Sequence, residues 1–422
     1  MKIFLLLIFL LPVAATGQQD SLVIPTPATV DLSFLIAEAM ENNPDIRAAV
    51  HEMDARDAHA SEVGVLEAPH LQYMQEGMPD FNFSQAMYSR LDFLQTIPFP
   101  SKLITDRRIA RIQAEHAHHD HLEIINATIA RLKSAYANLW YVQKSIVLDR
   151  ENARLMKEYA TIAQVRYGTA GASQQDVLKA QIERSLIQND LVGLRQQELS
   201  VKATIMALLN RASTDTLGYA IIPEEVVFDA NLDTLLAIAR TQRPMLTHDS
   251  LVITENEEMS SRAKEEYLPD FNAGLERMSS PGDDFHGWSI TFGISLPFFP
   301  WSFAATKAKS EEATASLERS KDLYVASQNS VMAAVRDLYY RASATRDQLK
   351  TYASSILPQS QQALEGSLAG YRSGTTDFLV LLDAYRSVVR VTKDYFGMRL
   401  QFEQTIAELE FSVGEQHISA RR

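Results

Sequence analysis

The chain has 422 residues, 46% hydrophobic and 22% charged, and its 53 acidic and 40 basic side chains give a formal net charge of −13. This composition excludes a disordered chain and argues against a nucleic-acid partner. The sequence contains no cysteine. Disulfides, thiolate zinc sites and thiol nucleophiles are therefore excluded.

Residues 1–17 are typical of an export signal peptide. A basic start, Met1-Lys2, precedes an apolar run from Ile3 to Val13 and then the small residues Ala14 to Gly17. Eleven apolar residues are too few for a membrane-spanning helix. We expect cleavage after Gly17 and a mature chain outside the cytoplasm; the alternative is an N-terminal anchor that stays attached.

Two halves of the chain resemble each other. Leu32–Pro44 and Leu232–Pro244 match without a gap 200 positions apart, and later segments match at 199 to 204 positions, including Tyr167 with Tyr371. Four matches in the same order indicate a tandem duplication. The sequence predicts a first repeat over residues 30–211 and a second over residues 231–414.

Each half is predicted to hold two short helices and then a pair of strands. The strands are expected at about 68–77, 87–97, 268–278 and 286–296. In the last of these, Trp288, Ile290, Phe292 and Ile294 alternate with small or polar residues. About ten residues suit a strand tilted across a bilayer, so these four side chains are predicted to face lipid. The alternative is a half-buried strand of a soluble sheet.

Very long helices are predicted to follow each strand pair. Ser101 to Tyr167 contains neither proline nor glycine. At 1.5 Å per residue this stretch could form one helix of roughly 100 Å. A second helix should return to about Asn210, and the second half should repeat the pair from Phe303 to Tyr371 and from Phe378 to Val413. Pro358 is predicted to kink the third of these four helices.

Four strands cannot close a membrane barrel, which needs at least eight. An oligomer is therefore expected: two chains would supply eight strands and three would supply twelve.

The chain resembles the TolC-type outer-membrane efflux proteins. The resemblance is carried by the duplication, by Pro98-Phe99-Pro100 and Pro297-Phe298-Phe299-Pro300 after the strands, and by Tyr371-Arg372-Ser373-Gly374-Thr375 leading into Val380-Leu381-Leu382-Asp383-Ala384. It implies a mainly α protomer with a small membrane β-barrel, completed as twelve antiparallel strands by a homotrimer. It also implies a helical tunnel in the periplasm and contact with outer-membrane lipid.

The function implied by this resemblance is the exit duct of a tripartite efflux or secretion system. Such a duct docks to a periplasmic adaptor protein and receives substrate from an inner-membrane transporter. The sequence does not identify the cargo: drugs, metal ions and polypeptides stay open.

The turns at Gly168 to Ser173 and Ser373 to Thr376 are predicted to form the periplasmic tip. Small residues there, Gly168, Ala170, Gly374 and Thr375, suit docking of the adaptor. The alternative is that Gly168 and Gly374 only cap helices.

A periplasmic gate is predicted beside these turns. Thr376, Val380 and Asp383 share one stripe of a helix, and their first-half counterparts are Ala172, Asp176 and Lys179. The resemblance implies that Asp176 and Tyr371 help to hold the closed state, although Thr376 and Val380 stand where well-known members have an arginine and an acidic residue. Lys179 and Asp383 offer an opposite-charge pair; the alternative is that these are ordinary surface charges.

Catalysis has little support in the sequence, which has no Gly-x-Ser-x-Gly turn and no phosphate-binding glycine loop. We assign no catalytic, cofactor-binding or metal-binding residue and expect no enzyme. His116, His118, His119 and His121 could supply metal ligands in pairs, or they could be a polar helix face. The alternatives to a duct are a coiled-coil structural or adhesive surface protein and a periplasmic enzyme, which would need convergent titratable groups.

Overall fold

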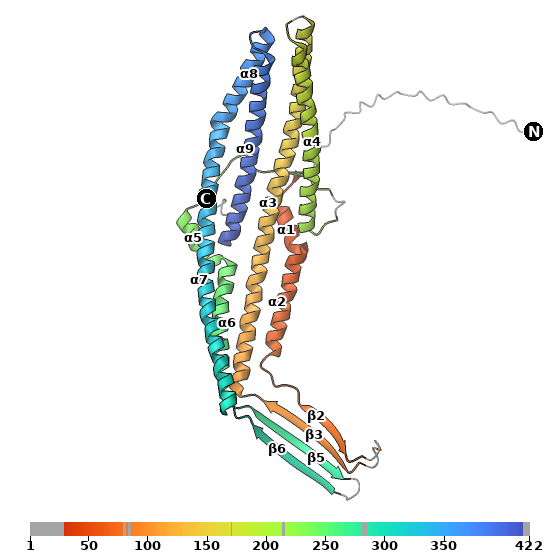
Figure 1. Ribbon diagram of the computed structural model, residues 1–422, viewed down its shortest axis with the longest axis vertical. Coiled ribbons are helices and arrows are strands. Elements are labelled where there is room, and N and C mark those ends of the chain that lie inside the picture. Colours follow the sequence, from red (N-terminus) through yellow and green to blue (C-terminus); the bar gives the residue numbers. More distant parts are fainter. Residues whose placement is uncertain are drawn as a thin grey trace, which may run out of the picture.

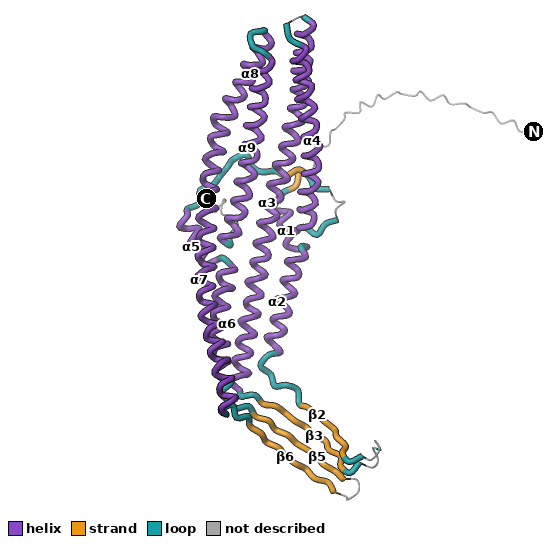
Figure 2. Tube along the Cα trace, in the orientation of Figure 1, coloured by secondary structure: helices purple, strands orange, loops and turns teal. Residues whose placement is uncertain are grey.

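The computed structural model describes residues 29–78, 82, 86–169, 171–212, 216–280 and 285–416. It is elongated, with long helices side by side and a sheet at one end (Figure 1). Figure 2 shows that the helical hairpin turns lie at the opposite end from the strands. We call that end the tip. The predicted signal peptide lies outside the described residues.

Helices dominate both halves of the chain. The first half holds α1 (Leu32–Asn42), α2 (Pro44–Glu62), α3 (Pro100–Gly168) and α4 (Gln174–Leu208). The second half holds α5 (Leu232–Gln242), α6 (Pro244–Glu265), α7 (Pro300–Thr351), α8 (Leu357–Ser373) and α9 (Phe378–Val413). The predicted mainly α fold with antiparallel strands is confirmed.

The long helices form where the sequence lacks helix breakers. Helix α3 runs unbroken for 69 residues. Its second-half counterpart is divided by a π-helical turn, Tyr352–Ile356, which stands just before Pro358. Because proline has no N–H to donate and its ring crowds the preceding turn, the helix widens there. The interruption predicted at Pro358 is therefore present as a π-helical turn.

The two halves place equivalent residues in equivalent positions. Asp31 caps α1 by accepting a hydrogen bond from the Ser33 amide, and Asn231 caps α5 by accepting from the amides of Asp233 and Thr234. The leucine and alanine that α1 buries have buried counterparts in α5, in the pairs Leu35 with Leu235 and Ala39 with Ala239. The exact repeat boundaries stay a prediction.

The strands form a four-stranded antiparallel sheet in the order β2-β3-β5-β6. These strands are β2 (His70–Glu76), β3 (Tyr88–Ile97), β5 (Phe271–Ser280) and β6 (Phe285–Ile294). The central pair joins the two halves, with Phe93 opposite Leu275. Two short strands near the middle of the molecule, β1 (Thr29–Val30) and β4 (Tyr219–Ala220), pair in parallel.

Strand β5 begins later than predicted because Asp270 has another role. Its carboxylate accepts a hydrogen bond from the Phe99 amide at 2.9 Å, and its two oxygens accept from the Lys102 ammonium at 2.8 and 2.9 Å. The Lys102 side chain is only 5% exposed. This contact joins the start of α3 to the start of β5 and so links the helical body to the sheet.

The buried side chains form separate clusters along the molecule. One packs α5, α7 and α9 around Leu235 and Leu409, and another packs α1, α3 and α4 around Leu35 and Leu132. A third lies near the tip. A long thin molecule has no single central core, so each level of the bundle is packed separately.

Candidate functional site at the tip and on the sheet

The tip consists of two helical hairpins, α3–α4 and α8–α9. All four helices contribute to one buried cluster that includes Met156 of α3, Ala180 of α4, Tyr371 of α8 and Leu381 of α9. Tyr371 is 1% exposed, and its ring packs on Phe378 at 5.4 Å between centroids. The tip is therefore packed as one unit within a single chain.

Each hairpin turn is shaped by its capping residues. Ser173 and Asp176 form a capping box at the start of α4, in which the Asp176 amide donates to Ser173 Oγ at 3.3 Å. Gly374 ends α8 with φ of +84°, which a residue with a side chain adopts only with strain. Gly374 therefore caps α8. Ala170, predicted to belong to the docking tip, lies outside the described residues.

Arg166, which no sequence pattern singled out, connects the two hairpins. It lies in the last turn of α3, donates to the carbonyl oxygen of Tyr371 on α8, and donates to the Gly171 carbonyl at 2.8 Å. Its guanidinium also stacks on the Tyr371 ring, 4.6 Å from the centroid. A lone arginine before a turn has no local signal, so only the fold could reveal this contact.

Two of the predicted gate residues, Asp176 and Tyr371, lie near each other across the two hairpins. Burial and the nearby Asp176 carboxylate raise the pKa of the Tyr371 hydroxyl, while Arg166 opposes them. That hydroxyl has no hydrogen-bond partner among the described residues. Asp176 and Tyr371 are thus close enough to interact electrostatically, without a direct hydrogen bond between their side chains in this chain.

Of the three residues predicted to share one helix stripe, Val380 and Asp383 lie on α9, whereas Thr376 precedes this helix. Val380 is 51% exposed and Asp383 is also exposed, whereas Thr376 is half-buried. The prediction of a Lys179–Asp383 pair is wrong within one chain: among the described residues, Glu183 pairs instead with Arg386 at 2.5 Å. The long side chain of Arg386 engages the Glu183 carboxylate with two nitrogens.

Farther from the tip, Lys133 of α3 pairs with Glu410 of α9. Three ion pairs nearer the tip have the opposite polarity. Each of them joins a carboxylate of α3 or α4 to a cation of α8 or α9. They are Glu158 with Arg372 at 3.4 Å, Glu183 with Arg386 at 2.5 Å and Asp149 with Lys393 at 3.0 Å. Unlike charges on the two hairpins favour their association.

The sheet has one strongly apolar face. Trp288, Ile290, Phe292 and Ile294 lie on that face of β6, and Phe292 is 82% exposed. The register places further exposed apolar side chains beside them, namely Leu275 on β5, Phe93 and Leu91 on β3, and Leu71 and Tyr73 on β2. An exposed apolar face spanning every strand marks an interaction surface.

The opposite face of the sheet is mostly polar, with Leu94 as an exposed apolar residue on it. Asp92 lies directly opposite both Gln72 and Glu276, and Arg90 pairs with Glu276 at 2.9 Å. Small residues, Thr291 and Gly293, continue this face on β6. The two faces therefore suit different surroundings.

The histidine segment divides between two sides of α3. His116 turns toward α6, where its Nδ1 lies 3.5 Å from Glu255 and its ring lies 4.9 Å from that of His248. Burial, and then neighbouring His118, lower the pKa of His119. Among the described residues, no group of three or more His, Asp or Glu side chains is placed to hold a metal ion.

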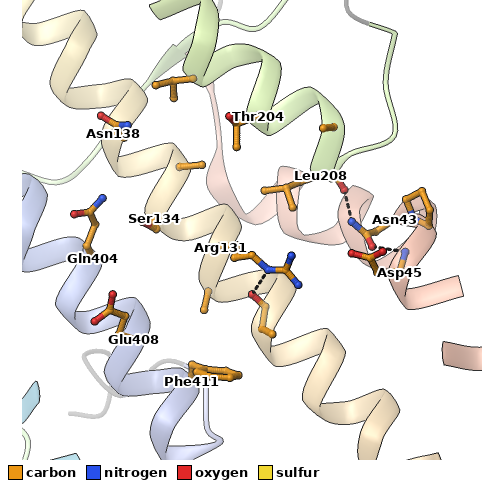
Figure 3. A pocket seen from close by; sticks show the side chains of 16 residues that line it. Asn43, Asp45, Arg131, Ser134, Asn138, Thr204, Leu208, Gln404, Glu408 and Phe411 are labelled. Atoms are coloured by element: carbon orange, nitrogen blue, oxygen red, sulfur yellow. Dashed lines mark hydrogen bonds between the residues drawn. The ribbon is translucent and has the colours of Figure 1, made fainter. Parts of the chain in front are cut away.

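A cavity of about 970 Å³ lies between α3 and α9, near the junction of α1 and α2. Figure 3 shows Gln404, Glu408 and Phe411 of α9 on one side and Arg131, Ser134 and Asn138 of α3 on the other. Asn43, at its edge, donates to the Leu208 carbonyl at 2.8 Å and caps α2. Arg131 donates to the Ala127 carbonyl of its own helix. These hydrogen bonds are all made with backbone groups, which indicates a structural role for the side chains.

None of the helices in the described part of the chain has an apolar stretch long enough to span a bilayer.

Comparison with known proteins agrees with this geometry. Residues 236–415 match the family model described as outer membrane efflux protein. The cobalt-zinc-cadmium resistance protein CzcC of Cupriavidus metallidurans is 21% identical over 96% of this chain and 97% of its own length.

Solved structures show the same fold. The outer-membrane channel OprN has a TM-score of 0.78 at 17% identity and covers 92% of this chain and 90% of its own. The open-state MtrE outer membrane channel of Neisseria gonorrhoeae has a TM-score of 0.75 at 17% identity, covering 91% and 89%. This chain therefore shares the fold of these outer-membrane channels, and its residues 236–415 resemble the outer membrane efflux protein family.

Proposed function

We propose that this protein is the outer-membrane channel of a tripartite efflux or secretion system, passing substrate from an inner-membrane transporter and a periplasmic adaptor to the outside. The observation that carries the proposal is the position of the apolar sheet face at one end of a long helical body. A strand with Trp288, Ile290, Phe292 and Ile294 exposed on one side suits lipid contact. The long helices would then extend into the periplasm.

The sheet supports a trimer because it is incomplete in one chain. Within the described part of the chain, strands β2 and β6 each lack a partner on their outer edge. Unpaired edges of amphipathic strands join other strands readily. Pairing β6 of one protomer with β2 of the next would close three sheets into a twelve-stranded barrel with the polar face inward.

The tip is proposed to hold the gate and the docking surface. The exposed stripe of Val380 and Asp383, with Thr376, would line the narrow end of the tunnel, opposite Asp176 and Lys179 of the other hairpin. Tyr371 would stabilise the closed state by its buried packing. The exposed turn residues Gly168, Gly374 and Thr375 would meet the adaptor, together with Ala170.

The test is assembly and conduction by the purified protein. We expect a heat-modifiable trimer from outer-membrane fractions and discrete single-channel currents in planar bilayers. A structural or adhesive coiled-coil protein would give neither result. A soluble monomer without channel activity would reject the proposal.

Docking at the tip is tested separately. Thr375→Trp should abolish export while leaving the trimer intact in the membrane, because a bulky side chain at an exposed turn obstructs packing of a partner helix. A matched control is Thr314→Trp, on an exposed part of α7. Normal export by Thr375→Trp would remove this turn from the docking surface.

For the cargo, we propose one class of substrate to test first. A relative is named for resistance to cobalt, zinc and cadmium. Divalent metal cations are therefore the cargo to examine first, by the metal sensitivity of cells that lack this protein and of cells in which it is restored. Equal sensitivity of the two strains would point to another cargo.

A further inference from the structure

We propose that Arg166 is the clamp that holds the α8–α9 hairpin against the α3–α4 hairpin, and that it must release when the tip opens. The proposal rests on the channel function above. Arg166 reaches across from α3 to the carbonyl oxygen of Tyr371, and its guanidinium lies over the Tyr371 ring at 4.6 Å. A second N–H group binds Gly171 at 2.8 Å, which fixes the direction of the side chain.

The physical reason for a cation at this point is the direction of the helices. Both α3 and α8 run toward the tip and end there, at Gly168 and Ser373. The C-terminal end of a helix carries partial negative charge and free carbonyl groups. Two such ends brought together repel each other unless a cation lies between them. Arg166 binds a carbonyl of the last turn of α8 from the last turn of α3, so it serves both ends.

The contact differs from the two arginine ion pairs that link the hairpins near the tip. The pairs of Glu158 with Arg372 and of Glu183 with Arg386 involve arginines that are more than half exposed. Exposed pairs contribute little and are weakened by salt. Arg166 is half-buried, binds uncharged carbonyls and adds a stacked ring. Salt should therefore weaken this contact less than it weakens the two exposed arginine pairs.

The turn of the second hairpin is shaped to receive this guanidinium. A Cβ on Gly374 would lie 3.2 Å from Arg166 Nη2, closer than most side-chain contacts allow. Thr376, which follows the turn, donates from its hydroxyl to the Ser367 carbonyl of its own hairpin. The second hairpin thus offers a small turn and carbonyl acceptors, and the first hairpin supplies the cation.

Two variants test the clamp. Arg166→Gln removes the charge and most of the reach, whereas Arg166→Lys keeps the charge but cannot donate to two carbonyls with a planar group. The control is Arg154→Gln, because Arg154 is an exposed α3 residue whose ion pairs are with Glu151 and Glu158 of its own helix.

Hydrogen exchange and conductance are measured together on the full-length trimer. In Arg166→Gln we expect amides of residues 371–382 to exchange about tenfold faster, since a hydrogen bond from a charged group is lost. Arg166→Lys should fall between this variant and the wild type. Amides of residues 271–294 should be unchanged, which shows that the sheet has folded, and Arg154→Gln should match the wild type throughout. Single-channel conductance should rise only in the Arg166 variants.

The outcomes separate the two proposals. Unchanged exchange at residues 371–382 in Arg166→Gln overturns the clamp even if the wild type conducts normally. Faster exchange with unaltered conductance shows that the clamp does not control opening and overturns that part. A wild type that never conducts rejects the channel function, while the exchange result still decides whether Arg166 holds the hairpins together.

Discussion

At the sheet end of the molecule the large apolar side chains point outward, with Phe292 82% exposed, whereas at the tip they point inward, with Tyr371 1% exposed. Among the described residues, the sheet also leaves two strand edges without partners, while the tip joins four helices into one buried cluster. The sheet therefore needs lipid or other chains to cover its apolar side chains and strand edges, whereas the apolar side chains of the tip are buried within one chain. Assembly should depend on the sheet and opening on the tip.

The largest expected effect is at the sheet. Ile290→Arg places a charge on the apolar face, which at the middle of a bilayer costs about 2 to 4 kcal/mol per chain. We expect the yield of membrane trimer to fall sharply, as measured on unheated gels. The control is Thr291→Arg, which lies on the polar face beside Gly274. A normal trimer from Ile290→Arg together with a harmful Thr291→Arg would mean that the faces are reversed.

A second effect is expected where the sheet meets the helices. Asp270→Asn removes the carboxylate that binds buried Lys102, and a hydrogen bond between charged groups contributes roughly 1.5 to 3 kcal/mol. Since Asp270 is partly exposed, the lower part of that range is expected, and thermal unfolding should start at a lower temperature. Asp322→Asn, on an exposed part of α7, is the control. Equal melting of the two variants would show that this junction adds no stability.

The same junction predicts a pH dependence. Burial by itself would raise the pKa of Asp270, but the hydrogen bonds from Lys102 and the Phe99 amide outweigh it and lower the pKa. A carboxyl with a lowered pKa stabilises the folded state above its unfolded pKa, and this contribution is lost as the pH falls through the folded value. The wild type should therefore lose its advantage over Asp270→Asn in acid, below about pH 4. A constant difference in melting temperature between pH 7 and pH 3 would contradict this assignment.

A smaller effect is expected at the tip turn. Gly374→Ala forces a left-handed conformation on alanine, which costs about 1 to 2 kcal/mol, and brings Cβ toward Arg166. Gly366→Ala, in the middle of α8 where a Cβ would meet only open space, should instead stabilise by roughly 0.5 to 1 kcal/mol. Hydrogen exchange at residues 357–382 distinguishes them. Exchange at these residues should be faster in Gly374→Ala and slower in Gly366→Ala, whereas exchange in the sheet should be the same in both variants.

The smallest effect is expected for an exposed pair between the hairpins. Arg386→Gln should cost about 0 to 1 kcal/mol of local stability, and a double-mutant cycle with Glu183→Gln should give a coupling that shrinks in high salt. A coupling above about 2 kcal/mol would place the main attachment of the hairpins here and not at Arg166.

Much of the fold could be predicted from local patterns. The stretch from Ser101 to Tyr167 has no helix breaker, and it forms one helix. The alternation of Trp288, Ile290, Phe292 and Ile294 with small residues places these four on one face of β6. Both patterns have the period of the structure that they predict, so neighbouring residues are enough to reveal them.

The candidate site could be predicted only in part. Tyr371, Val380 and Asp383 lie at the tip, but Thr376 precedes α9. Within one chain, the ion pair is formed by Glu183 with Arg386 and not by Lys179 with Asp383. A shift of one helical turn decides which charges meet, and an offset between repeats does not specify that shift. The histidines of α3 do not form one cluster, and His116 lies beside His248 of α6. Here too, the packing of neighbouring helices decides which side chains meet.

The sequence by itself determines the helices, the strands and the apolar face of the sheet, because these features depend on residues that are near each other in the chain. That Arg166 reaches Tyr371 and Lys102 reaches Asp270, across separations of 205 and 168 residues, follows only from the folded bundle. Such contacts depend on where two helix ends or a helix and a strand come to rest. Packing of the whole bundle sets that position. The residues next to an arginine or a lysine in the sequence do not predict which distant residue it will contact.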